Sequence, residues 1–416
     1  MNQSKQKNDK GIPEGWGADK IINVIDTIFS GGTPDTRKKE YWDGNIPWLS
    51  SGETGNRFIY KTEKTITDEG VNNSSTRLAR KGDVVIASAG QGYTRGQTAY
   101  CQIDTYINQS IVVLRTNEQR LDSQFLFYNL LSRYEELRQI SDGHSSRGSL
   151  TTKLLANLDI KFPKFLEEQA AIAKILFDLD TKIELNRQMN ETLEQMARTI
   201  FKRWFVDFEF PGLKKAKFVD GLPEGWRIGK ISDEFNLTMG QSPPGETYNE
   251  KGDGMPFFQG RTDFGFRYPS IRMFCSAPTR FAQADDTLVS VRAPVGAINM
   301  ANRKCCIGRG LAAIRHKSSS RSYSYYCMRS MEEIFKGFEA EGTVFGSLTK
   351  DSFGSIKVIV PPEEIVTHFE EAVYALDQKI ENNEKESQVL ITIRDALLPK
   401  LMSGEIRTLK HEEEIQ

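Results

Sequence analysis

The chain has 416 residues, of which 38% are hydrophobic and 27% are charged, and its formal net charge is −1. This length exceeds one ordinary hydrophobic core and predicts two to four structural units, and the composition excludes a largely disordered chain. The sequence holds no apolar run of roughly 18 residues and starts with polar residues, so we expect no membrane segment or signal peptide and a cytoplasmic location in a bacterium or archaeon.

The first 160 residues are predicted to form a globular part that is mixed but mostly β. Short apolar runs at 84–87 and 111–114 are bounded by Gly, Asp and Asn residues, as strands are. Apolar residues at helical spacing predict one helix over Ser123–Gln139, and an apolar strand over Leu158–Pro163 is expected to close this part.

A long helix is predicted from about Leu166 to Phe205. Its apolar residues step by four and three positions, which is the heptad pattern of a helix that packs along another helix. The acidic pair at 167–168 suits a helix N-terminus, and VDFEFPG at 206–212 is typical of an extended linker. The residues expected in the core of the helix pair are Ile172, Leu176, Leu179, Ile183, Asn186, Leu193 and Ile200.

The rest of the chain repeats the first part. GIPEGW at 11–16 recurs as GLPEGW at 221–226, at an offset of 210, and LDTKIELN at 179–186 recurs as LDQKIENN at 376–383, at an offset of 197. Further matched pairs lie between these two in the same order, and the offset falls in one direction along the chain. A period near 200 residues is too long for a solenoid, so we expect a duplicated unit of one globular part and one helix.

The helix seam also recurs in the second copy. Two such helices packed antiparallel about a pseudo-two-fold axis would bring Asn186 and Asn383 together near the middle, where a buried Asn fixes register at a cost in stability. The alternative is that both Asn side chains face solvent at the edge of the seam. The core residues expected in the second helix are Phe369, Val373, Leu376, Ile380, Asn383, Leu390 and Leu397.

The expected fold is therefore α+β, with the two helices forming an antiparallel coiled coil. The expected segments are a globular part at 1–160, a helix and linker at 161–210, a globular part at 211–361, and a helix and tail at 362–416.

The common sequence motifs of catalysis and cofactor binding are missing from the chain. It lacks a P-loop, a G-x-G-x-x-G turn after a strand, H-E-x-x-H and G-x-S-x-G. The Gly-rich segment 89–96 has no lysine and no helix pattern after it, so a turn between strands is favoured over nucleotide binding. The five cysteines form no C-x-x-C pair and there are only four histidines, so we expect no disulfide framework and no metal site.

Three pairs of loops occupy matching places in the two copies and differ in their polar residues. These pairs are 49–54 with 258–262, 89–96 with 292–296, and 142–149 with 341–347. Arg and Gln can make two hydrogen bonds to one base edge, and glycines let the backbone approach closely, so these loops are candidates for contact with nucleic-acid bases. Neutral drift of ordinary loop residues is the alternative. The candidate residues are Ser50, Ser51, Glu53, Gln91, Tyr93, Arg95, His144, Ser145 and Arg147 in the first copy and Gln259, Arg261, Arg292, Arg309 and Thr343 in the second.

Charge is distributed unevenly along the chain. Residues 211–361 carry 21 basic and 15 acidic side chains, whereas residues 362–416 carry 6 basic and 13 acidic ones. A mixed surface is the simplest interpretation, and charge alone does not identify a protein that binds nucleic acid.

The order and spacing of these segments resemble one known family, the specificity (S) subunits of Type I restriction–modification systems. Besides the paired G-[IL]-P-E-G-W motifs, the resemblance is carried by EEQAAIAKILFDLDTKIELN at 167–186, FKRWFVDFEFP at 201–211 and LLPKLMSGEIR at 397–407, and it covers essentially the whole chain. Two helix entries depart from the family pattern. The first reads FPKFLEEQ in place of a double proline, and the second reads PPEEI without the following Gln.

The resemblance implies two target-recognition domains, at 1–160 and 211–361, each of which reads one half of a split target in double-stranded DNA. It implies that the two helices space these domains and dock two methyltransferase subunits, and about 40 helical residues at roughly 1.5 Å each make a rod of ~60 Å. Adenine-N6 methylation and ATP-dependent cleavage would belong to the methyltransferase and restriction subunits. S-adenosylmethionine, ATP and Mg are therefore expected on those partners, and this chain is expected to bind no cofactor and to be no enzyme.

Two other interpretations remain open. The chain resembles, less closely, an S-like subunit of another restriction–modification architecture whose partner is a fused endonuclease–methylase. An interpretation from a different class is a scaffold whose paired domains bind proteins and not DNA.

Overall fold

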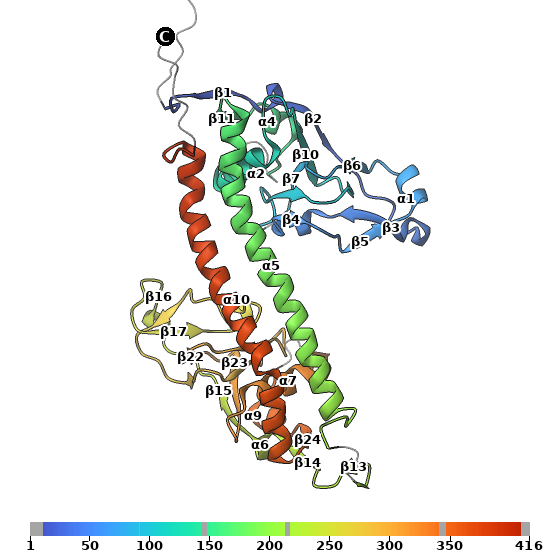
Figure 1. Cartoon of the computed structure of the whole chain (residues 1–416), viewed down its shortest axis with the longest axis vertical. Helices are drawn as coiled ribbons and strands as arrows, with labels where there is room; N and C mark the ends of the chain where they lie inside the picture. Colours follow the sequence, from blue (N-terminus) through green and yellow to red (C-terminus); the bar gives the residue numbers. More distant parts are fainter. Residues whose placement is uncertain (1–10, 91, 143–147, 213–216, 341–346, 409–416) are drawn as a thin grey trace, which may run out of the picture. The chain divides into compact units, whose positions relative to one another are not determined.

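The computed structural model describes residues 11–90, 92–142, 148–212, 217–340 and 347–408. The chain divides into two compact units: unit 1 comprises residues 1–182 and 390–416, and unit 2 comprises residues 183–389. Both boundaries fall inside long helices, so each unit holds one globular part together with part of each helix (Figure 1). This division differs from the four expected segments, because the helices share hydrophobic cores with the globular parts.

Unit 1 contains a five-stranded sheet and a four-stranded sheet. The five-stranded sheet has the order β2 (Ile25–Ser30), β10 (Ile111–Thr116), β7 (Val84–Ala87), β8 (Thr98–Cys101) and β4 (Phe58–Ile59). The four-stranded sheet has the order β5 (Lys64–Ile66), β3 (Trp42–Leu49), β9 (Thr105–Ile107) and β6 (Arg77–Ala79). The predicted closing strand, β11 (Asp159–Pro163), pairs antiparallel with β1 (Trp16–Lys20).

The helices of unit 1's globular part are α1 (Asp68–Asn72), α2 (Ser123–Ser132), α3 (Tyr134–Asp142) and α4 (Thr152–Ala156). The prediction of one continuous helix over 123–139 was wrong. Arg133 ends α2 in a non-helical conformation, and its backbone amide donates to the carbonyl of Leu130 at 3.1 Å. The Arg133 guanidinium then binds Glu136 at 2.7 Å and the carbonyl of Asp159 at 2.8 Å, so polar contacts hold the break between α2 and α3.

Unit 2 contains a four-stranded sheet, a five-stranded sheet and two strand pairs. The four-stranded sheet has the order β15 (Phe235–Met239), β23 (Leu311–His316), β20 (Thr287–Ser290) and β21 (Ile298–Met300). The five-stranded sheet has the order β16 (Tyr248–Asn249), β18 (Phe274–Cys275), β17 (Met255–Phe258), β22 (Cys305–Ile307) and β19 (Phe281–Ala282). The strand pairs are β14 (Arg227–Lys230) with β24 (Lys357–Val360), and β12 (Phe218–Val219) with β13 (Leu222–Pro223). The helices of unit 2's globular part are α6 (Ile231–Glu234), α7 (Arg321–Ser330), α8 (Glu332–Ala340) and α9 (Lys350–Ser355).

The two units share their topology. The order β2-β10-β7-β8 in unit 1 matches the order β15-β23-β20-β21 in unit 2. The strand that carries the X-Pro-aromatic sequence, β3 or β17, pairs parallel with β9 in unit 1 and with β22 in unit 2. The structure therefore confirms the duplicated α+β unit that the internal repeat predicts.

The long helices are α5 (Leu166–Phe205), with the bounds expected from the sequence, and α10 (Glu363–Ser403). They run antiparallel in unit 2, because Phe201 contacts Phe369, with ring centroids 5.6 Å apart, while Asn190 contacts Asn383. Gly404 follows α10 with a φ of 75°, a left-handed conformation that glycine adopts readily at the end of a helix.

The apolar seam faces inward in both helices. The fully buried seam residues are Ile172, Leu176, Asn186, Phe369, Val373, Ile380 and Asn383. The half-buried ones are Leu179, Ile183, Leu193, Ile200, Leu376, Leu390 and Leu397.

In unit 2, α7 lies between the four-stranded sheet and the long helices. The ring of Tyr323 packs against Phe201 and Phe205 of α5, and on its other side it stacks on Phe235 of β15, with centroids 6.2 Å apart. In unit 1, α2 has the same place (Figure 1). The Tyr128 hydroxyl of α2 donates a hydrogen bond to Asp180 of α5. The sheets are thus fastened to the helix pair through one short helix in each unit.

Chemically reactive groups are scarce in the ranges that the structure describes. No helix there is long and apolar enough to cross a membrane, and no three His, Cys, Asp or Glu side chains gather as a metal site requires. All five cysteines are buried free thiols, and burial raises the pKa of Cys305 and of Cys327 to about 12. A thiol with so high a pKa is a poor nucleophile at neutral pH.

Candidate nucleic-acid interface

The loop after β3 holds the candidates Ser50, Ser51 and Glu53. A 3₁₀ helix covers Ser51–Gly55, and the Glu53 side chain is buried at 4% exposure. Its Oε1 atom accepts hydrogen bonds from the amide and the hydroxyl of Ser50 at 3.0 and 2.9 Å, and its Oε2 atom accepts from the amide of Glu63 at 2.8 Å. Glu53 therefore shapes the loop from inside, which corrects its expected role as a base contact.

The Gly-rich loop between β7 and β8 displays one aromatic ring. Tyr93 is 83% exposed. Its backbone carbonyl accepts a hydrogen bond from the Tyr134 hydroxyl at 2.6 Å, and the carbonyl of Gly92 accepts one from Arg138. The backbone of the loop is thus fastened to α3, and the Tyr93 ring remains available for stacking on a base.

Arg95, from the same loop, points inward. It is 8% exposed and forms an ion pair with Asp142 at the end of α3. A Cβ atom at Gly148 would collide with the Arg95 guanidinium, so the chain passes close over this ion pair. The expected base contact of Arg95 is corrected accordingly, because its guanidinium supports the loop.

Several candidates lie outside the residues that the structure describes. They are Gln91, His144, Ser145, Arg147 and Thr343.

In unit 2 the structure brings the candidates Gln259 and Arg309 together around Ser242. The Nε2 atom of Gln259 donates to the Ser242 hydroxyl oxygen at 2.9 Å, and the backbone amide of Arg309 donates to the same oxygen at 3.3 Å. Both candidates are exposed. The amide of Gln259 and the guanidinium of Arg309 are thus exposed on residues that contact the same hydroxyl. Both groups can make paired hydrogen bonds to base edges.

Sequence reasoning missed the equivalent cluster in unit 1. Thr33 and Gln109 correspond to Ser242 and Arg309 at offsets of 209 and 200, and the Thr33 hydroxyl donates to the side-chain oxygen of Gln109. Gln109 is exposed, as Arg309 is. The internal repeat could have identified Gln109, because aligning the two copies around Arg309 places Gln109 at the equivalent position.

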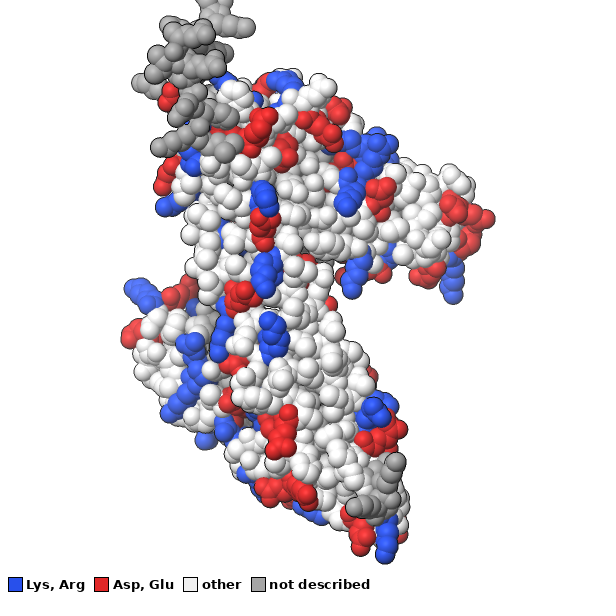
Figure 2. All heavy atoms as spheres, viewed as in Figure 1, with Lys and Arg blue, Asp and Glu red and all other residues white. Residues whose placement is uncertain are grey.

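The remaining candidates of unit 2, Arg261 and Arg292, are both exposed. Arg261 begins the 3₁₀ helix Arg261–Asp263, and the backbone of Arg292 forms a bridge with Ser347. Figure 2 shows Lys and Arg side chains gathered over the part of unit 2 that carries β17 and β22. The basic excess of residues 211–361 therefore reaches the surface beside the loops of the five-stranded sheet, where it favours a polyanion.

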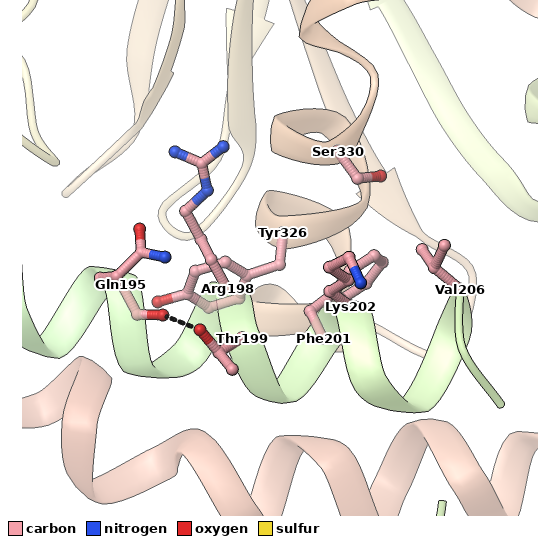
Figure 3. Close-up of a pocket in the computed structure, with 8 residues that line it drawn as sticks. All are labelled: Gln195, Arg198, Thr199, Phe201, Lys202, Val206, Tyr326 and Ser330. Atoms are coloured by element: carbon pink, nitrogen blue, oxygen red, sulfur yellow. Dashed lines mark hydrogen bonds between the residues drawn. The ribbon is translucent and has the colours of Figure 1, made fainter. Parts of the chain in front are cut away.

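A hollow of about 370 Å³ lies between α5 and α7 in unit 2 (Figure 3). Arg198 and Lys202 contribute cations to its wall, and Tyr326 contributes a ring. No candidate for base contact lines it. Its wall has no carboxylate or histidine, so it offers no acid–base pair for catalysis.

The fold and these loops together define a protein with two diverged copies of one α+β domain, each fastened to part of an antiparallel helix pair. The family whose sequence model matches is described as Type I restriction modification DNA specificity domain, and the match covers residues 13–195 and 223–392. The chain belongs to this family, and it carries the domain twice.

Named relatives agree with this assignment. The chain is similar to the putative Type I restriction enzyme MjaX specificity subunit of Methanocaldococcus jannaschii, with 32% identity over 307 residues, which is 72% of this chain and 71% of that protein. It is also similar to the MjaIX specificity subunit of the same organism, with 29% identity over 424 residues, which is 95% of this chain and 94% of that protein. The crystal structure of the Type-I restriction-modification system S subunit from M. genitalium shares the fold, with a TM-score of 0.57, 19% identity, and coverage of 96% of this chain and 98% of that one.

Proposed function

We propose that this chain reads DNA sequence within a Type I restriction–modification complex, and that each unit reads one half of a two-part target. The observation that carries the proposal is a duplicated fold in which strand order is kept while polar residues at equal loop positions differ. Ser50 stands against Gln259, and Gln109 stands against Arg309. Two copies of one reading surface with different side chains are suited to two different short sequences.

Exposed apolar side chains on the helices support docking of a protein partner. In unit 2, α5 exposes Leu185 at 52% and Met196 at 49%, and α10 exposes Tyr374 at 51% and Val389 at 58%. Apolar side chains exposed along a helix mark surfaces that bind other proteins. We infer that two methyltransferase subunits dock on the helix pair, and that restriction subunits join them in the full complex.

The chemistry is assigned to these partners. Adenine-N6 methylation and ATP-driven cleavage need S-adenosylmethionine, ATP and Mg, and we assign those ligands to the methyltransferase and restriction subunits, with this chain as a non-catalytic subunit in the cytoplasm. Because the net charge of this chain is −1, we infer that the partners supply many of the cationic contacts to DNA phosphates.

Mapping of methylated adenine tests the proposal. A host that carries this chain and its methyltransferase partner is expected to methylate one two-part motif genome-wide. Replacing residues 82–100, which include Tyr93, with those of another family member should change one half of that motif and leave the other half intact. An unchanged motif would favour the protein-binding scaffold. The genes beside this one distinguish a separate methyltransferase from a fused endonuclease–methylase partner.

A further inference from the structure

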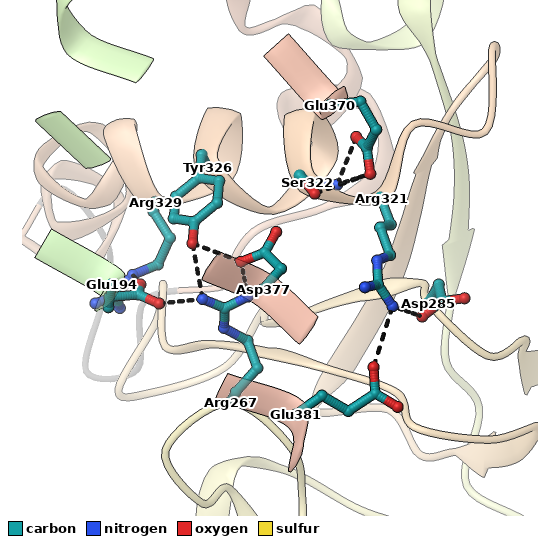
Figure 4. A network of polar contacts seen from close by, with 10 residues as sticks. All are labelled: Glu194, Arg267, Asp285, Arg321, Ser322, Tyr326, Arg329, Glu370, Asp377 and Glu381. Carbon is teal, nitrogen blue, oxygen red and sulfur yellow. Dashed lines mark hydrogen bonds and ion pairs between the residues drawn. The ribbon is translucent and has the colours of Figure 1, made fainter. Parts of the chain in front are cut away.

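One buried arginine in unit 2 connects the segment after β17 to both long helices. Arg267 is 1% exposed, and its Nη1 atom donates to the carboxylate of Asp377 on α10 at 2.9 Å. Its Nη2 atom donates to the Tyr326 hydroxyl on α7 at 2.8 Å and to the carboxylate of Glu194 on α5 (Figure 4). The Tyr326 hydroxyl in turn donates to Asp377 at 2.8 Å. One guanidinium therefore joins three helices.

The surroundings keep this arginine charged. Its guanidinium carbon lies 4.1 Å from the ring centroid of Tyr325, within the range of a cation–π contact. Burial works against the charged form, but Tyr325, Tyr326 and the two carboxylates outweigh it and hold the pKa of Arg267 well above its usual value. A buried cation with two buried carboxylate partners is stable only while all partners stay in place.

The segment around Arg267 is a closed loop that also carries a candidate for base contact. Phe264 and Pro269 form a bridge, and the amide of Ser270 donates to the carbonyl of Asp263 at 2.8 Å. The carbonyl of Arg267 accepts from the amide of Met300 on β21 at 2.8 Å. Arg261 lies two residues before this closure and is exposed. The tip of the loop is thus held by the helices, and its base presents Arg261 to solvent.

Unit 1 holds the same three residue types at equivalent places in its fold: after the X-Pro-aromatic strand, on α2 and on a long helix. Arg57, Tyr128 and Asp180 precede Arg267, Tyr326 and Asp377 by 210, 198 and 197 residues. The Tyr128 hydroxyl donates to Asp180 at 2.9 Å, and the Arg57 Nη1 atom lies 3.6 Å from the same carboxylate.

Arg57 also follows a candidate loop, as Arg267 does. It lies two residues after the 3₁₀ helix Ser51–Gly55, and its carbonyl accepts a hydrogen bond from the amide of Tyr100 at 2.8 Å. The segment that follows the X-Pro-aromatic strand therefore has the same plan in both units. It exposes polar residues first, and an arginine further along then contacts a Tyr–Asp pair on the helices.

The geometry points to a positioning role for these two arginines, an inference that rests on the proposed function of reading DNA. We propose that Arg267 and Arg57 each fix the loop after β17 or β3 against the helices of its own unit, so that the base-contacting side chains of that loop keep one set position on the DNA. Neither arginine touches DNA itself. Catalysis by a docked methyltransferase needs the target base at one place, so a loop that shifts by about 1 Å loses discrimination.

Variants of each arginine test this in the assembled complex of the full chain with its methyltransferase subunits. Arg267→Met and Arg57→Met keep most of the side-chain volume and remove the guanidinium. Methylation rates are measured on a DNA panel in which each base pair of both half-targets is changed in turn. We expect each variant to lose roughly tenfold in discrimination within one half-target, with the two variants affecting opposite halves. Arg227→Met, at an exposed arginine of unit 2 that pairs with Glu234, is the matched control and should keep wild-type discrimination.

Tyr326→Phe keeps the ring and removes the hydroxyl between Arg267 and Asp377. It therefore tests the positioning role of Arg267 even if Arg267→Met does not fold. It should relax the same half-target as Arg267→Met, roughly threefold. Equal loss in both halves, or a lower rate on every DNA with unchanged discrimination, would overturn the positioning role. A wild-type complex that shows no two-part specificity would instead refute the proposed function itself.

Discussion

The side-chain amide of Asn383 donates a hydrogen bond to the Oδ1 atom of Asn190 at 2.8 Å, and both side chains are buried in the helix pair of unit 2. Asn186 makes the repeat-related contact, because its amide donates to the Ser387 hydroxyl at 3.2 Å. The 197-residue offset converts Asn186 into Asn383 and Asn190 into Ser387. Asn186 and Asn383 therefore meet in the helix pair as expected, and the Asn186 amide also donates to the backbone carbonyl of Asn383 at 3.4 Å. The alternative in which both side chains face solvent is wrong, because both are buried.

Asn383→Ala is expected to destabilise the chain. The substitution leaves Oδ1 of the buried Asn190 without its donor, and an unsatisfied buried acceptor costs about 1–3 kcal/mol. Asn382→Ala changes an exposed neighbour on the same helix and should be near neutral. Unfolding of the full chain by urea measures both. Equal midpoints for the two variants would mean that the Asn383–Asn190 contact contributes nothing.

The two buried arginines should differ in their effect on stability. Arg267→Met leaves Glu194 and Asp377 buried, and among the described residues Glu194 then keeps Arg329 as its one ion-pair partner, at 3.4 Å. We expect a loss of about 3–5 kcal/mol in the free energy of unfolding, as for other buried ion pairs that lose one partner.

Arg57→Met should cost less, about 1 kcal/mol. The Arg57 side chain is 33% exposed, and Asp180 keeps both Arg394 at 2.6 Å and the Tyr128 hydroxyl. Urea unfolding of the two variants, each against wild type, measures the difference. A cost for Arg57→Met as large as that for Arg267→Met would contradict the assignment of Arg394 as the main counter-charge of Asp180.

His316 predicts a pH dependence of stability. His316 is 8% exposed, and its ring packs against Phe235 and Tyr323. Burial lowers the pKa of His316 below 6.5, and the charge of Lys317 lowers it further. These effects outweigh Glu234 and Glu363, which raise the pKa. The unfolded chain therefore binds the proton more readily, and the stability that neutral His316 provides is present above about pH 6.5 and lost as the pH falls from there towards the folded pKa.

Unfolding by urea between pH 5 and 7.5 measures this effect. His316→Gln should flatten the decline in stability below about pH 6.5. The matched control is His368→Gln, at an exposed histidine of α10. A decline in His316→Gln as steep as in wild type would assign the pH dependence to other groups.

The duplication and the bounds of α5 could be predicted because they rest on patterns in the sequence itself. Heptad spacing from Leu166 to Phe205 and the matched motifs needed no knowledge of distant contacts. The direction of individual loop side chains could not be predicted. Arg95 turns inward because its guanidinium pairs with Asp142, which lies 47 residues later in the chain at the end of α3. Glu53 turns inward because its carboxylate accepts a hydrogen bond from the amide of Glu63.

The buried Arg57 and Arg267 escaped sequence reasoning for a related reason. Their offset of 210 differs from the 198 and 197 of their tyrosine and aspartate partners, so no single alignment shift brings the three pairs together. The partners lie on α2 or α7 and on the long helices, and only the folded chain brings them to the arginine. A charged residue in a loop is usually solvated, and nothing local in the sequence distinguishes these two.

Arg261 and Arg309 are the exposed cations that we expect to contact bases in unit 2. Arg261→Ala or Arg309→Ala should each cost roughly 1–3 kcal/mol on the wild-type target and relax one base position in one half of it, because a bidentate contact to one base edge is lost. Binding and methylation on single-base variants of the target measure this, with Arg303→Ala, another exposed arginine of unit 2, as the comparison. A variant that weakens binding equally on all sequences and lowers its salt dependence would identify a phosphate contact instead, since neutralising one phosphate fewer reduces the number of counterions released.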